Sequence, residues 1–114
     1  MNNISEALDL YQTEACKTMN TNLTQKEINS KMAMKLVAEI GALCDKIVGA
    51  DHFFGTLQDA FMEEKLGDIL WFIAIIADNN GIRLSDIANY NIDKLRKRHG
   101  HQFNENYYLE KELK

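Results

Sequence analysis

The chain has 114 residues, of which 46% are hydrophobic and 26% are charged, so it can form one domain with a sizeable core but not two. Its formal charge of −4 argues against general nucleic-acid binding, and its composition is that of a folded protein rather than a disordered one. The longest apolar run, residues 69–77, is far shorter than the ~20 residues that span a bilayer, so no membrane association is predicted.

Cysteine usage and the N-terminal sequence indicate a reducing compartment. Cys16 and Cys44 fall within helical patterns and lack the spacing of a metal site. The first residues lack the basic start and apolar run of a signal peptide. We therefore expect a cytoplasmic protein whose cysteines pack as small apolar residues.

Two amphipathic helices are predicted in the first half of the chain. Ser5 can cap a first helix that runs to about Met19, because apolar residues recur there at helical spacing. Thr24 and Glu27 have the spacing of a capping box, in which each side chain accepts a hydrogen bond from the backbone N–H group of the other residue. The second helix should start there and run to about Val48, just before a glycine.

Residues 49–56 are predicted to form a loop with two aromatic residues, and residues 63–77 to form the core helix. That helix joins an acidic cluster directly to an apolar run, and a helix that is apolar on all sides must be buried in protein. Asp68 lies where the two parts meet, and Glu64 lies one turn earlier on the same face. Two carboxylates beside a dry core need a cation or a hydrogen-bond donor. Glu63, in contrast, is expected to be solvated.

A last helix is predicted after a turn at residues 79–81. Ser85 offers a side-chain oxygen for its N-cap, and the helical pattern runs from Asp86 to about His99. Two helices should therefore meet at this short turn.

Polar and basic side chains on this last helix are candidates for binding phosphate. Asn91 lies in the middle of an apolar stripe, so its amide needs a partner. Lys94 and Arg98 follow at positions that project from roughly the same side. The alternative, that basic residues here only pair with the helix C-terminus and aid solubility, is preferred for Arg96 and Lys97.

Four segments of the sequence, in this order and spacing, are typical of one family. They are Tyr11-Gln12 with Ala15, Glu39-Ile40-Gly41, Leu66-Gly67-Asp68-Ile69-Leu70-Trp71-Phe72, and Asn91-Ile92-Asp93-Lys94-Leu95 with Arg98 and Phe103. A lone Leu-Gly-Asp would be a weak signal, but the combination is hard to obtain by chance. On these segments, which cover nearly the whole chain, the sequence resembles the MazG-like, all-α nucleoside triphosphate pyrophosphohydrolases.

The resemblance implies an all-α fold, an antiparallel helical bundle of four main helices, in a single domain at residues 1–102 with a C-terminal tail at residues 103–114. It also implies a homodimer or homotetramer, in agreement with the need of the core helix for a neighbouring subunit. The implied reaction converts a nucleoside triphosphate to the monophosphate and pyrophosphate. Mg²⁺ would be held by an E-x-x-E motif on one helix and an E-x-x-D motif on the next, and would activate a water molecule.

The sequence departs from these metal motifs at two positions. Ala42 replaces the second carboxylate of the first motif, and Lys65 replaces the first carboxylate of the second motif. Its ammonium group would repel a divalent ion and attract a phosphate. The candidates that remain for catalysis and for holding one Mg²⁺ are Glu39, Glu64 and Asp68. The candidates for binding substrate are Lys65, Asn91, Lys94 and Arg98.

Three interpretations remain open. The first is an active pyrophosphohydrolase with a weakened Mg²⁺ site, and the second is a catalytically lapsed nucleotide-binding or regulatory protein on the same scaffold. The third, a purely structural helical protein, would leave Asp68, Asn91 and Lys94 without a reason to lie beside apolar faces. For Glu39 alone, the alternative is an ion pair with Lys35 on its own helix.

Overall fold

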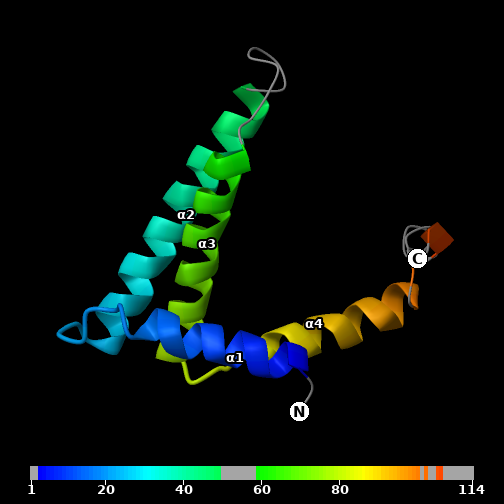
Figure 1. Ribbon diagram of the computed structural model, residues 1–114, viewed down its shortest axis with the longest axis horizontal. Coiled ribbons are helices and arrows are strands. Elements are labelled where there is room, and N and C mark those ends of the chain that lie inside the picture. Colours follow the sequence, from blue (N-terminus) through cyan, green and yellow to red (C-terminus); the bar gives the residue numbers. More distant parts are fainter. Residues whose placement is uncertain (1–2, 50–58, 101, 103–104, 107–114) are drawn as a thin grey trace.

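The computed structural model describes residues 3–49, 59–100, 102 and 105–106, and these residues form four helices and no strand. The helices are α1 (Asn3–Cys16), α2 (Gln25–Gly49), α3 (Asp59–Asn79) and α4 (Leu84–His99), as Figure 1 shows. This confirms the prediction of an all-α fold with four main helices. None of the helices in the described part of the chain is long and apolar enough to cross a membrane.

Two predicted segments fall mostly outside the described residues. The loop predicted at residues 49–56 is described only at Gly49, where α2 ends. The tail predicted at residues 103–114 is described only at residues 105–106. The boundary between domain and tail therefore stays a prediction.

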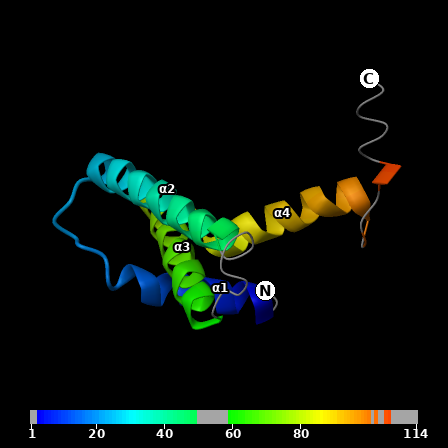
Figure 2. The same cartoon turned by 90° about the horizontal axis from the view of Figure 1, so that it is seen from above.

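Helices α2 and α3 form an antiparallel pair, upright in Figure 1 and still side by side in Figure 2. The predicted capping box at the start of α2 is confirmed. The backbone N–H of Thr24 donates to Glu27 Oε1 over 3.2 Å, and the backbone N–H of Glu27 donates to Thr24 Oγ1 over 3.2 Å. The first of these bonds is the main cause that lowers the pKa of Glu27.

Side-chain amides join the start of α2 to the end of α3. Asn79 Nδ2 donates to Gln25 O and to Asn29 Oδ1, over 2.9 and 2.7 Å. Gln25 Nε2 donates in return to Asn79 O over 2.9 Å. The α3 helix ends here, and Gly81 has the positive φ of 70° that glycine adopts most readily after a helix.

The core of the chain lies where α1 crosses the base of the α2–α3 pair (Figure 1). Ala15 of α1, Ala74 and Ala77 of α3, and Leu84 of α4 form one buried cluster, in which Ala74 is 0% exposed. These small side chains let the helices approach closely. Trp71 packs against the cluster, and its indole N–H donates to Thr18 Oγ1 over 2.9 Å.

The predicted caps of α1 and α4 are wrong. Ser5 lies inside α1 and is buried, and α1 ends at Cys16 rather than at Met19. The N-cap of α4 is Arg83, which makes no side-chain cap hydrogen bond, and Ser85 is the second residue of that helix. The physical reason at α4 is that side chains of α1 bond to its first backbone N–H groups.

The core helix is only partly covered within one chain, as expected from its need for a neighbouring subunit. Ala74, Ile75 and Ala77 are buried, but Leu66 and Leu70 are 49% and 41% exposed. Helix α4 runs away from the α2–α3 pair (Figure 1), and the radius of gyration is 17.5 Å, against about 13 Å for a compact domain of this length. One chain therefore leaves an apolar side of α3 open.

The two cysteines have different surroundings. Cys16 on α1 is half-buried and Cys44 on α2 is exposed, and both are free thiols. Burial, with smaller contributions from the charge of Asp78 and from a hydrogen bond to its carboxylate, raises the pKa of Cys16 to about 11. The thiol of Cys16 therefore stays protonated at neutral pH.

We predict that iodoacetamide at pH 8.5 modifies Cys44 at least ~10-fold faster than Cys16, because only about 0.3% of a thiol with a pKa of about 11 is thiolate at that pH. Peptide mass spectrometry over a time course measures both rates. Folding raises the pKa of Cys16 from 9.0, so the folded chain holds this proton more tightly than the unfolded chain does. The resulting contribution to the free energy of unfolding is present below pH 9 and is lost as the pH rises towards about 11. Equal rates in the folded protein would contradict the assignment, and equal rates in urea are the control.

Candidate functional site

An ion pair joins the two helices that hold the predicted metal motifs. Lys65 Nζ on α3 lies 3.3 Å from Glu39 Oε2 on α2, and the two side chains are 24% and 29% exposed. Glu39 thus pairs with Lys65 across the helix pair rather than with Lys35 on its own helix. The ring centroid of Phe61, one turn before Lys65, lies 6.0 Å from the same ammonium nitrogen.

This ion pair matters more for geometry than for stability. Partly exposed pairs contribute about 0–1 kcal/mol, because solvent screens the charges and two long side chains must be ordered. What the contact shows is that the Glu39 segment of α2 faces Lys65 of α3. The two motif segments therefore face each other, with an ammonium group between them.

The other candidate carboxylates are open to solvent in the single chain. Glu64 and Asp68 are both exposed, and so is Ala42 on α2. Asp68 was expected at the edge of a dry core, but its neighbour Leu66 is itself half-exposed. Within the described residues, no three His, Cys, Asp or Glu side chains are grouped so that they could hold a metal ion.

Helix α4 contributes to an open hollow of about 620 Å³. Asn91 and Lys94 lie at this hollow, together with Leu70 and Ile73 of α3, with apolar residues of α1, α4 and the connection, and with the acidic residue Asp86 of α4. The amide, the ammonium and the carboxylate are the polar groups beside an otherwise mostly apolar surface. Arg98, one turn after Lys94, is half-buried and does not line the hollow.

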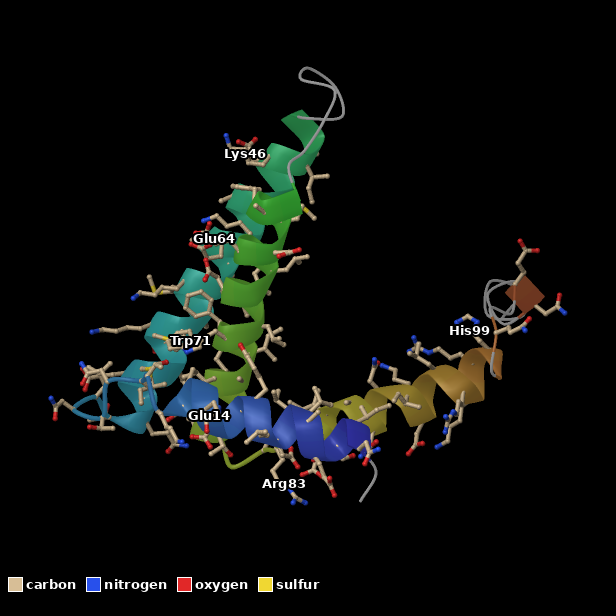
Figure 3. All side chains as sticks on the ribbon, viewed as in Figure 1. Glu14, Lys46, Glu64, Trp71, Arg83 and His99 are labelled. Carbon is tan, nitrogen blue, oxygen red and sulfur yellow. The ribbon has the colours of Figure 1, made fainter. Side chains whose placement is uncertain are left out.

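The predicted site residues occupy two arms of one chain. Glu39, Glu64, Lys65 and Asp68 lie on the α2–α3 pair, whereas Asn91, Lys94 and Arg98 lie on α4. Figure 3 shows Glu64 on the first arm and His99 at the far end of the second. The hollow lies mainly along α4, and the first arm contributes Leu70 and Ile73 to its lining. Within one chain the structure therefore brings Glu39 to Lys65, and Asn91 to Lys94, but does not gather all seven residues.

Two polar residues of α1, Asp9 and Gln12, have a structural role that the sequence did not predict. Gln12 is only 6% exposed and bonds to backbone groups of α3 and of the connection to α4. Asp9 bonds to Ser85 at the start of α4. The available signal was position, since Gln12 falls four residues after Leu8 and three before Ala15, on the apolar face of the helix.

Comparison with models of protein families identifies the family of this chain. The family model described as the MazG nucleotide pyrophosphohydrolase domain matches residues 27–103, more than half of the chain, including α3, α4 and most of α2. No curated protein and no solved structure matches the chain.

Proposed function

The chain belongs to the MazG nucleotide pyrophosphohydrolase domain family, and on this premise we propose that it converts a nucleoside triphosphate to the monophosphate and pyrophosphate through a weakened Mg²⁺ site. The observation that carries the proposal is the contact between Glu39 and Lys65. It lies where α2 and α3 face each other, as a site shared between the two helices requires. The same contact puts an ammonium group where the family resemblance implies a carboxylate.

The carboxylates present fit a single, weakly held Mg²⁺ better than a pair of ions. Glu64 and Asp68 are one turn apart on α3, and such a site often needs only one or two carboxylates, with water and phosphate oxygens completing it. Glu39 pairs with Lys65 through Oε2, so the ammonium group would lie close to any Mg²⁺ that Glu39 helped to hold and would weaken its binding. A bound Mg²⁺ would supply charge neutralisation on the phosphates and activation of a water molecule.

The candidate site residues have different roles in this proposal. The ammonium groups of Lys65 and Lys94 and the guanidinium of Arg98 would neutralise phosphate oxygens, and the amide of Asn91 would orient the substrate. The carboxylate of Asp68, aided by Glu64, would hold the metal. A cytoplasmic location belongs to the same proposal, since both described cysteines are free thiols.

The second candidate function is a catalytically lapsed nucleotide-binding or regulatory protein, and the Glu39–Lys65 ion pair also favours it. An ammonium group can neutralise a phosphate without a metal, but it cannot lower the pKa of a water molecule as a metal ion does. A chain of this kind would bind nucleotide in the absence of Mg²⁺ and turn it over poorly. The two candidates therefore differ in turnover and not in the ligand.

We predict that the chain binds nucleoside triphosphate in EDTA and, with Mg²⁺ present, releases pyrophosphate slowly. No release at all would favour the lapsed-protein candidate. Substituting Ala42→Glu together with Lys65→Glu should weaken binding in EDTA and increase metal-dependent pyrophosphate release. Each substitution alone should do less, because the carboxylates act as one cluster. Pyrophosphate release with Mg²⁺ or Mn²⁺, across a panel of nucleotides, measures both the activity and the preferred base.

The matched control is Lys35→Glu with Ala38→Glu, which makes the same change of charge at exposed positions of α2 and should change neither property. Turnover by the unmodified chain at roughly 1 s⁻¹ or faster would contradict the lapsed-protein candidate, because that is an ordinary enzymatic rate. Glu64 would then be the substitute for the missing ligand. No binding to any nucleotide of the panel would contradict both candidates.

A second prediction separates the two kinds of acidic residue on α3. Asp68→Ala should abolish Mg²⁺-dependent nucleotide binding, whereas Glu63→Ala should change it little, because only Asp68 and Glu64 share one face of the helix. Both residues are exposed, so neither substitution disturbs the core. Titration calorimetry with nucleotide and Mg²⁺ compares them. If both variants bind alike, the metal is not held by Asp68.

A third prediction concerns assembly. We propose a homodimer or homotetramer in which a second copy covers the open side of α3, because one chain leaves Leu66, Leu70 and Ile73 38–49% exposed. Light scattering at micromolar concentration should give at least twice the mass of one chain. Leu70→Asp should shift this mass towards that of the monomer. A monomer mass for the unmodified chain would refute the assembly.

A further inference from the structure

The start of α4 is capped by side chains of α1. The backbone N–H of Leu84 donates to Gln12 Oε1 over 3.0 Å, and that of Ser85 donates to Asp9 Oδ1 over 3.1 Å. Ser85 Oγ donates to Asp9 Oδ2 over 2.8 Å. Helix α4 therefore obtains from another helix the acceptors that a local N-cap residue usually provides.

Three side chains make these contacts, and we name them the α1 latch: Ser5, Asp9 and Gln12. They follow at i, i+4 and i+7 and so lie on one face of α1. Ser5 Oγ accepts a hydrogen bond from Asn89 Nδ2 over 3.4 Å, one turn further along α4. The latch therefore runs beside the first turns of α4, and the carboxylate of Asp9 also suits the positive end of that helix.

Gln12 connects α4 to α3 as well. Its Nε2 donates to Ile82 O over 2.9 Å and to Ala74 O over 3.3 Å, while its Oε1 accepts from Leu84. One buried amide thus bonds to the last turns of α3, to the connection and to the first residue of α4. A buried amide with all its groups bonded resists displacement, because each broken bond would leave an unpaired polar group. Gln12 therefore fixes the angle at which α4 leaves α3.

That angle decides where the candidate phosphate-binding groups lie. Asn91 and Lys94 of α4 line the hollow opposite Leu70 and Ile73 of α3, and Leu8 of α1 lines it too. Rotation of α4 about its start would move Lys94, some two to three turns away, by several ångströms. Any such rotation must first break the bonds of the latch.

We propose that Gln12 and Asp9 are positioning residues, which act through the angle of α4 to place Asn91 and Lys94 for a triphosphate. The choice of ligand rests on the proposed function. The positioning itself rests on the hydrogen bonds of the latch and on the residues at the hollow. Neither Gln12 nor Asp9 lines the hollow itself.

The first test is a double-mutant cycle in which calorimetry measures the binding of inorganic tripolyphosphate. Gln12→Met should weaken binding about 10-fold, and Lys94→Ala should weaken it about 10-fold in the unmodified chain but less than 3-fold when Gln12 is already replaced. Distant residues without contact give multiplicative effects, so this coupling is a readout that a merely structural role would not produce. Multiplicative effects in chains that remain folded by circular dichroism would overturn the proposal.

The control is Gln25→Met. It removes a similar hydrogen bond, from the amide of a glutamine to the carbonyl of Asn79 on another helix, but that bond joins α2 to α3 and not α1 to α4. It should change tripolyphosphate binding less than 2-fold. Asp9→Asn is the milder variant if Gln12→Met fails to fold. It keeps one acceptor for Ser85, loses the charge, and should weaken binding about 3-fold with the same loss of coupling to Lys94.

The second test does not depend on a ligand. Spin labels at Glu63→Cys and Lys97→Cys, with Cys16→Ser and Cys44→Ser, report the distance between α3 and α4. Gln12→Met, or Asp9→Asn in its place, should broaden this distance distribution, and Gln25→Met should not. An unchanged distribution would overturn the proposal. If the distribution broadens but the unmodified chain does not bind tripolyphosphate, the proposed function fails while the latch is supported as the device that orients α4.

Discussion

The packing of α1 against the last turns of α3 is the contact on which the rest of the chain depends. Alanines at positions 15, 74 and 77 keep the two helices close, and this closeness lets the amide of Gln12 reach the carbonyl of Ala74. From there the amide also bonds to the connection and to the start of α4. A few small side chains and one buried amide thus set the direction of a whole helix.

Apart from the Ser5 cap of α1, features set by neighbours in sequence were predicted well, and those set by distant residues were not. The Thr24–Glu27 capping box forms as predicted because both partners lie within one turn. Ser85 has the right residue type for an N-cap, but its hydroxyl bonds to Asp9, 76 positions earlier in the chain. No local pattern contains that information. The apolar run at residues 69–77 predicted a helix correctly, but its burial depends on surfaces that one chain lacks.

The same division holds for the candidate site. The sequence identified the family, which needs only residue types and spacing. The two departures from the metal motifs stay a prediction. The sequence did not identify the partner of Glu39, since Lys35 at i−4 is as good a partner by spacing as Lys65 is across the helix pair. Nor could it place Lys94 relative to Asp68, because the angle between α3 and α4 follows from tertiary bonds to Gln12.

The position of α1 has a consequence for how the limits of this domain are defined. The family match begins at residue 27, so it leaves out α1 entirely. A fragment cut at that limit would lose Gln12 and Asp9, leave the first N–H groups of α4 without their acceptors, and expose Ala74 and Leu84 to water. The segment that the family model matches is therefore smaller than the segment that packs together in this chain, because α1 contributes hydrogen bonds and buried surface to α3 and α4.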